Sequence, residues 1–296
     1  VATGTDLRDP LASTAMASLD LVIDGVDFAE GPRWHDDRLW YADFYQRAVY
    51  TVDDSGERTA VHDGLDDQPS GLGWMPDGSL LVVAMTSRAV WREVDGALVH
   101  HADLSGVAAF HCNDMVVDRR GNAYVGNFGF DLPDRASFAP ADLALVRPDG
   151  SVAVAAEGLA FPNGMVISPD GATLIVGQTF GGDYQAFHIA EDGSLTDRRQ
   201  WAQIPGTAPD GCTLDAGGGI WFADAVGSQL VRVLEGGEVT DRIATPMPVY
   251  ACALGGGDGT TLYACCAPDA HPDVVEGRAA GAIYAVAVDV PHAGLP

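Results

Sequence analysis

The sequence predicts an all-β protein, a six-bladed β-propeller whose central channel holds a metal ion. A unit of several short apolar strands recurs six times, at a spacing of roughly 40 to 50 residues, which is typical of propeller blades. Asp-Gly and glycine-rich turns separate the strands within the units, as expected of β-hairpins. No stretch has a helical period, which excludes a doubly wound α/β fold. A β-sandwich is the alternative, but it fits six repeats in register poorly.

The elements follow in a regular order. Residues 1–18 are polar and alanine-rich and predict an N-terminal arm, and residues 19–296 predict a single propeller domain. Leu19–Asp24 alternates apolar and polar residues and predicts a strand, which we expect to pair with Ile283–Val288 and close the ring. The six repeats are expected to open with these strand pairs: Ala29–Asp43, Pro69–Val83, His111–Gly126, Phe161–Val176, Ala208–Asp224 and Tyr250–Cys265.

Composition narrows the range of partners. The 296 residues carry a net charge of −26 and contain no lysine, which argues against nucleic acid and anionic membrane surfaces as partners. No apolar run reaches the length of a membrane span, and no signal peptide is visible, although a segment could have been removed before Val1. Five cysteines, Cys112, Cys212, Cys252, Cys265 and Cys266, have no metal-binding spacing and suit a reducing cytoplasm. The oligomeric state is not predicted.

One register of the repeats carries polar side chains. The innermost strand of each blade lines the channel, so equivalent repeat positions are related by rotation about its axis. Aligning the turns places five residues in one ring: Glu30, Ser70, Asn113, Asn163 and Asp210. The sixth position falls at or near Ala251, and we attribute the glycine that follows four of the five to a tight backbone turn. Two carboxylates with amide and hydroxyl oxygens suit one divalent cation, Ca²⁺ first, with Mg²⁺, Mn²⁺, Zn²⁺ and Fe²⁺ open.

Two further residues are candidates for the channel mouth. His111 precedes Asn113 by two positions, so on an extended strand both side chains face one side. It is a candidate substrate contact or proton carrier, or else a turn histidine that caps a backbone group. Gln178 ends the second strand of its unit and is a candidate substrate contact. The insertion from Phe128 to Pro140 and the loop from Thr179 to Asp183 are candidates for the rim of the pocket.

Four motifs resemble the SMP-30/gluconolactonase/luciferin-regenerating-enzyme family: Glu30-Gly-Pro-Arg-Trp, Asn113-Asp, Pro162-Asn-Gly-Met and Pro209-Asp-Gly-Cys-Thr-Leu-Asp. The resemblance covers nearly the whole chain and implies a six-bladed propeller with a divalent metal in its channel and sugar lactones as substrates. It implies that Glu30, Asn163 and Asp210 are metal ligands, that Asn113 is a further ligand or substrate contact, and that Asp210 is a candidate general base. The chain departs from the family at His111, often an arginine, and at Gln178, often an acid, and both changes argue against a gluconolactone-like substrate.

These expectations define a metal-dependent hydrolase that opens a lactone or similar ester. The cation would polarise the carbonyl, and Asp210 or His111 would activate water. The alternatives are a phosphotriesterase, hydratase or isomerase on the same metal propeller, and a non-enzymatic metal-binding or interaction propeller.

Overall fold

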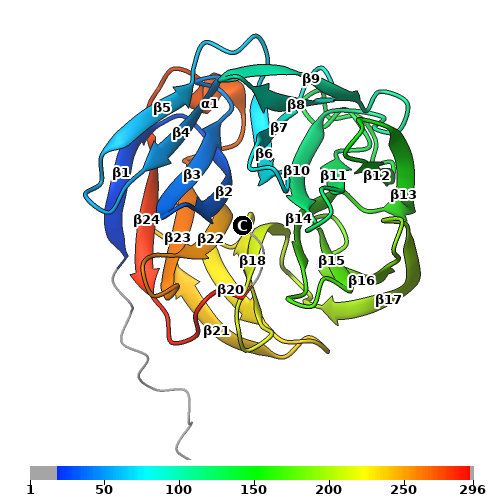
Figure 1. The fold of residues 1–296 in the computed structure, drawn as a ribbon. Coiled ribbons are helices and arrows are strands. Elements are labelled where there is room, and N and C mark those ends of the chain that lie inside the picture. The colour runs from blue at the N-terminus through cyan, green and yellow to red at the C-terminus, as the bar shows by residue number, and fades with distance from the viewer. Residues whose placement is uncertain (1–18, 294–296) are drawn as a thin grey trace, which may run out of the picture.

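Six four-stranded antiparallel sheets surround a central channel (Figure 1). The computed structural model describes residues 19–293. We number the blades 1 to 6 in the order of their inner strands, and five blades are consecutive in sequence. Their strands are, for blade 1, β2 (Ala29–His35), β3 (Arg38–Asp43), β4 (Ala48–Val52) and β5 (Arg58–His62); for blade 2, β6 (Pro69–Trp74), β7 (Leu80–Ala84), β8 (Ala89–Val94) and β9 (Ala97–Asp103); for blade 3, β10 (Cys112–Val117), β11 (Ala123–Asn127), β12 (Ala141–Val146) and β13 (Val152–Leu159); for blade 4, β14 (Pro162–Ile167), β15 (Thr173–Gln178), β16 (Asp183–Ile189) and β17 (Leu195–Gln203); and for blade 5, β18 (Pro209–Leu214), β19 (Ile220–Asp224), β20 (Gln229–Val233) and β21 (Val239–Ala244).

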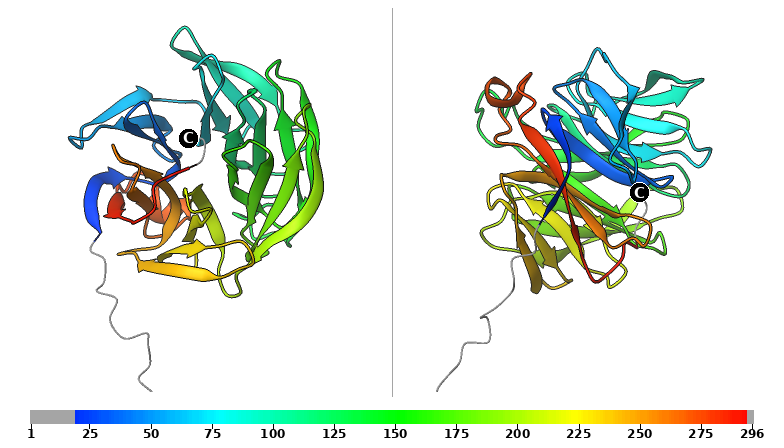
Figure 2. Two further views of the ribbon diagram at one scale, coloured as in Figure 1. Left: turned by 60° about the horizontal axis from the view of Figure 1, so that its bottom comes forward. Right: turned by 90° about the vertical axis from the view of Figure 1, so that its left-hand side faces the viewer.

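Blade 6 closes the ring with strands from both ends of the described chain. It contains β22 (Val249–Gly255), β23 (Thr261–Cys266), β24 (Gly281–Ala287) and, outermost, β1 (Asp20–Val26). The pairing of β1 with β24 sets Asp20 opposite Ala285, which confirms the predicted closing strand. Figure 2 shows the first strand in blue beside the last in red. The predicted arm, residues 1–18, lies outside the described residues.

Alternating apolar residues form the core between neighbouring blades. One cluster joins blades 2 and 3, another joins blades 3 and 4, and a third joins blades 4 and 5. Neighbouring Cys265 and Cys266 point to different clusters, as expected for adjacent strand residues. All five cysteines are buried thiols. The cytoplasmic location expected from them stays a prediction.

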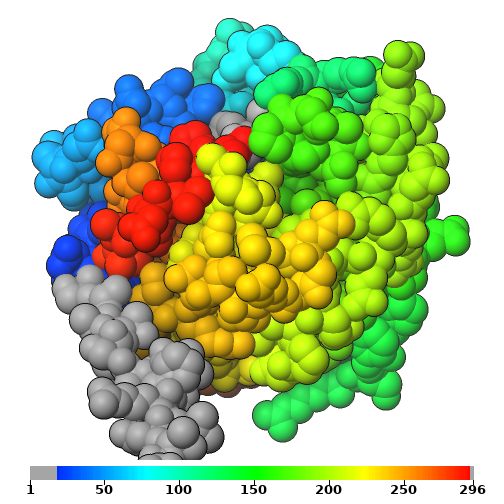
Figure 3. Space-filling model, turned by 90° about the horizontal axis from the view of Figure 1, so that it is seen from below, coloured from blue at the N-terminus to red at the C-terminus, as the bar shows by residue number. Residues whose placement is uncertain are grey.

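Helical structure is almost absent. Within residues 19–293 the only helix is α1 (Pro272–Val275), a single turn between β23 and β24. It is too short to cross a bilayer. After β24 the chain runs against blade 5, where the backbone of Ala216 donates to Pro291 O at 2.7 Å. Figure 3 shows this red segment in contact with the yellow surface of blade 5. This contact lies at the end of the channel where the inner strands finish.

Candidate metal and active site

A β-bulge at the start of every inner strand creates the polar ring. In blades 2 to 5 the first residue of the inner strand pairs with the last residue of the second strand, and the register then shifts by one residue. In blade 1, Ala29 pairs with Asp43 and the same shift follows Glu30. The ring residue therefore lies at the bulge in each blade, where an extra residue re-aims a side chain. All five predicted members are buried: Glu30, Ser70, Asn113, Asn163 and Asp210.

The glycines that follow the ring residues allow the blades to approach closely. A Cβ on Gly164 would lie 2.3 Å from the carbonyl oxygen of Asp210 in the next blade, and one on Gly71 would lie 2.4 Å from the backbone nitrogen of Met115. Only Gly31 of the four has a positive φ, at 52°. The expected tight turn is therefore wrong for the other three, where contact between neighbouring inner strands requires glycine.

The sixth ring position belongs to Tyr250. Val249 pairs with Cys266 and the register shifts before Ala251, so Tyr250 stands at the bulge. Ala251 occupies the place of the glycine and lies against Gly211 of blade 5. The expected position, at or near Ala251, is therefore one residue late. Burial raises the pKa of the Tyr250 phenol, and the nearby carboxyls of Asp269, Asp210 and Glu30 raise it further.

The two ring carboxyls are removed from water and close enough to affect each other. Burial raises the pKa of Glu30 well above its ordinary value, and the charges of Asp210 and Asp114 add to the shift. Burial also raises the pKa of Asp210, to about 8, with Asp114 contributing and the amide of Asn163 acting in the opposite sense. Such shifts show that the protein alone does not compensate two negative charges here.

One amide of the ring, that of Asn163, has an oxygen without a hydrogen-bond partner within residues 19–293. Asn163 donates from Nδ2 to Oγ1 of Thr179 at 3.1 Å, and Thr179 in turn donates to Pro209 O at 2.7 Å. The orientation of the amide is thereby fixed. Its Oδ1 is buried and has no hydrogen-bond partner among the described residues. A buried acceptor without a partner is costly and points to a missing donor or cation.

Beneath the ring, a buried ion pair crosses the channel. Arg33 of β2 donates from Nη2 to Oδ1 of Asp114 at 2.6 Å and to Met115 O at 2.6 Å, while its Nη1 donates to Pro32 O at 2.8 Å. Asp114 stands where four of the other inner strands carry glycine and blade 6 carries Ala251. Both residues belong to motifs of the sequence, but their partnership joins blades 1 and 3, so no local pattern predicts it.

The donor set fits a hard divalent cation. Within residues 19–293, no three histidine, cysteine or acidic side chains gather into a cluster of metal ligands. The oxygens of Glu30, Asp210 and Asn163 are of the type that Ca²⁺ and Mg²⁺ prefer. This set contains only two acidic side chains, with an amide as the third, so it is not a cluster of that kind. With the carboxyls of Glu30 and Asp210 both deprotonated, the ring would carry two negative charges, which one divalent cation balances, whereas Asp114 is paired with Arg33.

His111 stands at the mouth, just before β10. Its ring stacks on Phe110, with centroids 4.1 Å apart, and lies 5.9 Å from Phe128. Burial lowers the pKa of the imidazole, which favours its neutral form at neutral pH. The charged groups that affect this pKa are Asp131, Asp67 and Arg88, and the ring carboxyls are not among them. A role in substrate contact or proton transfer stays a prediction.

Gln178 is engaged by its own chain. Its Oε1 accepts from the backbone of Ala160 at 2.7 Å, and its Nε2 donates to Oδ1 of Asp183 at 2.6 Å. This arrangement supports the β15–β16 loop. The predicted contact of Gln178 with substrate stays a prediction, with both ends of the amide already bonded.

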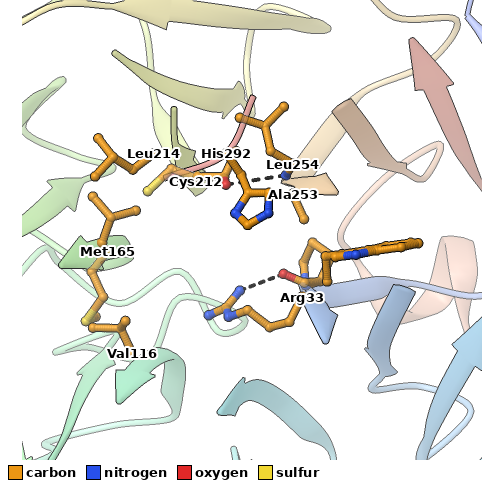
Figure 4. A pocket seen from close by; sticks show the side chains of 12 residues that line it. Arg33, Val116, Met165, Cys212, Leu214, Ala253, Leu254 and His292 are labelled. Carbon is orange, nitrogen blue, oxygen red and sulfur yellow. Dashed lines mark hydrogen bonds between the residues drawn. The ribbon is translucent and has the colours of Figure 1, made fainter. Parts of the chain in front are cut away.

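The lower half of the channel contains an apolar pocket. Val116, Met165, Cys212 and Leu254 line it, with Arg33 on the side of the ring. Figure 4 shows the His292 ring projecting into this space above Arg33. The polar ring lies toward the other end of the channel, where the inner strands begin.

Comparisons with known proteins agree with this geometry. The sequence profile of the SMP-30/Gluconolactonase/LRE-like region matches residues 28–267. Pentonolactonase XacC of Haloferax volcanii is 29% identical over 90% of this chain and 92% of its own length. The 6-deoxy-6-sulfogluconolactonase of Pseudomonas putida is 26% identical over 90% of this chain and 93% of its own. The structure of a gluconolactonase from Xanthomonas campestris superposes with a TM-score of 0.75 and 26% identity, covering 93% of this chain and 90% of that one.

Proposed function

Because the chain belongs to the SMP-30/gluconolactonase/LRE-like family, we propose that it is a divalent-metal-dependent lactonase. The relatives named above are lactonases that act on sugar-derived lactones. The observation that carries the proposal is the buried ring of Glu30, Asn163 and Asp210, with two desolvated carboxyls and an amide oxygen that lacks a partner.

Glu30, Asn163 and Asp210 would hold the cation, with Asn113 as a further ligand or substrate contact. Ca²⁺ is our first assignment, because every donor is a hard oxygen and no histidine or cysteine belongs to the ring. When bound, the cation supplies Lewis-acid polarisation of a lactone carbonyl. The Thr179 hydroxyl fixes the Asn163 amide by a hydrogen bond of 3.1 Å, so that its Oδ1 is held in place before any ligand arrives.

Asp210 is our candidate for the group that takes a proton from the attacking water. A bound cation would hold the Asp210 carboxyl in its ionised form, and burial favours the protonated form, so the carboxylate has a driving force to take a proton from water at the cation. The walls around it consist of tightly packed inner strands, which exclude bulk water from its side. His111, at the mouth, is the second candidate for the same step.

The test is hydrolysis of a panel of lactones by the metal-loaded protein, followed in a pH-stat, with elemental analysis of bound metal. We expect Asp210→Asn to lower kcat by about 10²-fold or more. Ser70→Ala, at a ring position without a proposed ligand role, is the matched control and keeps its activity. The decrease in kcat of His111→Gln measures how much His111, the second candidate, contributes to proton transfer.

Two results would contradict the proposal. Full activity of Asp210→Asn at unchanged metal content removes Asp210 from the mechanism. A metal-loaded wild-type protein that hydrolyses no lactone would transfer the site to another reaction, such as phosphotriester hydrolysis, hydration or isomerisation, or to metal binding without catalysis.

A further inference from the structure

Polar residues at the mouth of the channel are bonded to their own chain. Four blades end their second strand with a buried polar residue whose hydrogen bonds go to neighbouring loops. Asp43, for example, accepts from the backbone of Asp27 at 2.8 Å, and Asp224 accepts from Ala208 at 2.9 Å. Asn127 and Gln178 are bonded in the same way. A ligand covered with hydroxyl groups would need unpaired partners, which these four do not offer.

Phenylalanines cover the same end of the molecule over blades 3 and 4. Phe128 and Phe161 stack with centroids 4.5 Å apart, and Phe161 lies 5.3 Å from Phe180. Phe180 in turn lies 5.5 Å from Phe130 and 5.9 Å from Phe138. We call the following set the aromatic wall: Phe110, Phe128, Phe130, Phe138, Phe161 and Phe180. It joins the two predicted rim segments, the insertion from Phe128 to Pro140 and the loop from Thr179 to Asp183, into one surface.

The aromatic wall begins at the polar ring. Phe161 precedes the ring residue Asn163 by two positions, and Phe180 follows Thr179, which holds the Asn163 amide. Phe161 has a φ of 64°, a conformation that a bulky residue rarely adopts and that tends to persist at functional sites. At its other end the wall reaches His111 through the stacked ring of Phe110.

Part of the wall is open to solvent. Phe138 and Phe180 are each 52% exposed, whereas Phe130 and Phe161 beneath them are buried. Two half-exposed aromatic rings above a buried aromatic layer, next to a candidate catalytic ring, form an apolar surface of the kind that marks a binding site. Binding of an apolar group there would be favourable, because it would remove the exposed surfaces of both rings from water.

We propose that the substrate is a lactone with an apolar substituent, an alkyl chain or an aryl group, that packs on the aromatic wall while its ester group meets the polar ring. This assignment rests on the proposed lactonase function and narrows it. It places hydroxyl-rich sugar lactones second, because the wall offers them aromatic faces and the four polar residues at the ends of the second strands are already paired.

Three six-membered lactones test the assignment with metal-loaded wild-type protein. δ-Decalactone carries a pentyl chain, δ-valerolactone carries no substituent, and D-glucono-δ-lactone carries hydroxyl groups. We expect kcat/KM for δ-decalactone to exceed the other two values by about ten-fold or more, since a few buried methylenes reach this ratio. Equal or higher values for D-glucono-δ-lactone would overturn the assignment and leave the lactonase function standing. Hydrolysis of none of the three, nor of any other lactone, would overturn both.

A double variant, Phe138→Ser with Phe180→Ser, tests the wall itself. Both side chains are half-exposed, so their replacement leaves the core intact. We expect the ratio of kcat/KM for δ-decalactone to that for δ-valerolactone to fall about ten-fold. Val226→Ser removes an apolar side chain that is 72% exposed at the same end of blade 5, outside the wall, and is the control with an unchanged ratio. An unchanged ratio in the double variant would exclude the wall as the binding surface.

Discussion

Replacing Arg33 by methionine removes the positively charged guanidinium that reaches across the channel from blade 1 to blade 3. It leaves the buried carboxylate of Asp114 without its partner. The side chains of Arg33 and Asp114 are 9% and 3% exposed, so water cannot replace the lost contact. Breaking a buried pair by removing one member costs about 3–5 kcal/mol, and Met115 O loses its donor as well. For a chain of this size we expect the midpoint of thermal unfolding, Tm, to fall by about 6 °C or more.

A second substitution separates charge from packing. Arg33→Met combined with Asp114→Asn removes both charges and restores the formal balance of the channel, so we expect it to recover a large part of the lost stability. The pair of Arg232 and Asp215 in blade 5 has the same 2.6 Å separation but lies away from the ring carboxyls, and Arg232→Met is the matched control. Differential scanning calorimetry with and without added Ca²⁺ measures all variants. We expect Ca²⁺ to reduce the deficit of Arg33→Met, because a bound cation offsets the extra negative charge, and to leave that of Arg232→Met unchanged. A double variant no more stable than Arg33→Met would refute the reasoning and make Arg33 a packing residue.

Two further predictions concern the ring. Gly164→Ala sets a methyl group 2.3 Å from Asp210 O, so we expect the free energy of unfolding in urea to fall by about 2 kcal/mol. Gly106→Ala, with open space at its Cβ, is the control and should change this free energy by no more than about 0.5 kcal/mol. Equal stability of the two variants would contradict the close approach of blades 4 and 5. In the metal-free protein, the pKa of Asp210 is raised from 3.8 to about 8. The folded protein therefore binds more protons than the unfolded chain between these pH values. We expect its free energy of unfolding to fall as pH rises through this window, by on the order of 5 kcal/mol in total. Thermal unfolding in a chelator between pH 5 and 9 measures this fall, added Ca²⁺ should flatten it, and a Tm that rises with pH in the chelator would show that Asp210 is ionised without metal.

The propeller and most of its polar ring follow from the sequence because each blade repeats one local pattern. A proline or alanine, then the ring residue, then glycine opens four inner strands, and this pattern sets blades 1, 2, 4 and 5 in register without knowledge of any contact. In blade 6 the pattern is lost, because Val249 replaces the proline and Ala251 the glycine. Tyr250 could be assigned only from its pairing at the bulge.

Contacts between blades could not be predicted in the same way. Arg33 and Asp114 lie 81 residues apart, and no periodicity links an arginine in one inner strand with an acid in another. The prediction that the glycines after the ring residues form tight turns was wrong at three of the four positions for a related reason. A turn is a local property, whereas the carbonyl oxygen of Asp210 that excludes a Cβ at Gly164 belongs to another blade. In blade 3, Asp114 stands at the glycine position and supplies the carboxylate of the ion pair, which sequence periodicity does not reveal.

The unequal ring also gives the channel a direction. Blades follow one another around the axis in chain order, so Asp210, Tyr250 and Glu30 occupy three successive positions, while Asn113 and Asn163 come from blades 3 and 4 on the other side. Negative charge is therefore concentrated on one side, and Arg33 extends from that side to Asp114 on the other. The aromatic wall rises from blades 3 and 4, above the amides. An ester group at the centre of the ring, with its apolar substituent on the wall, would have Tyr250 and Glu30 on its opposite side and Asp210, of the neighbouring blade 5, at its flank. This arrangement places the proposed proton acceptor beside the Asn163 amide and next to the wall, and it follows from which blade carries each residue.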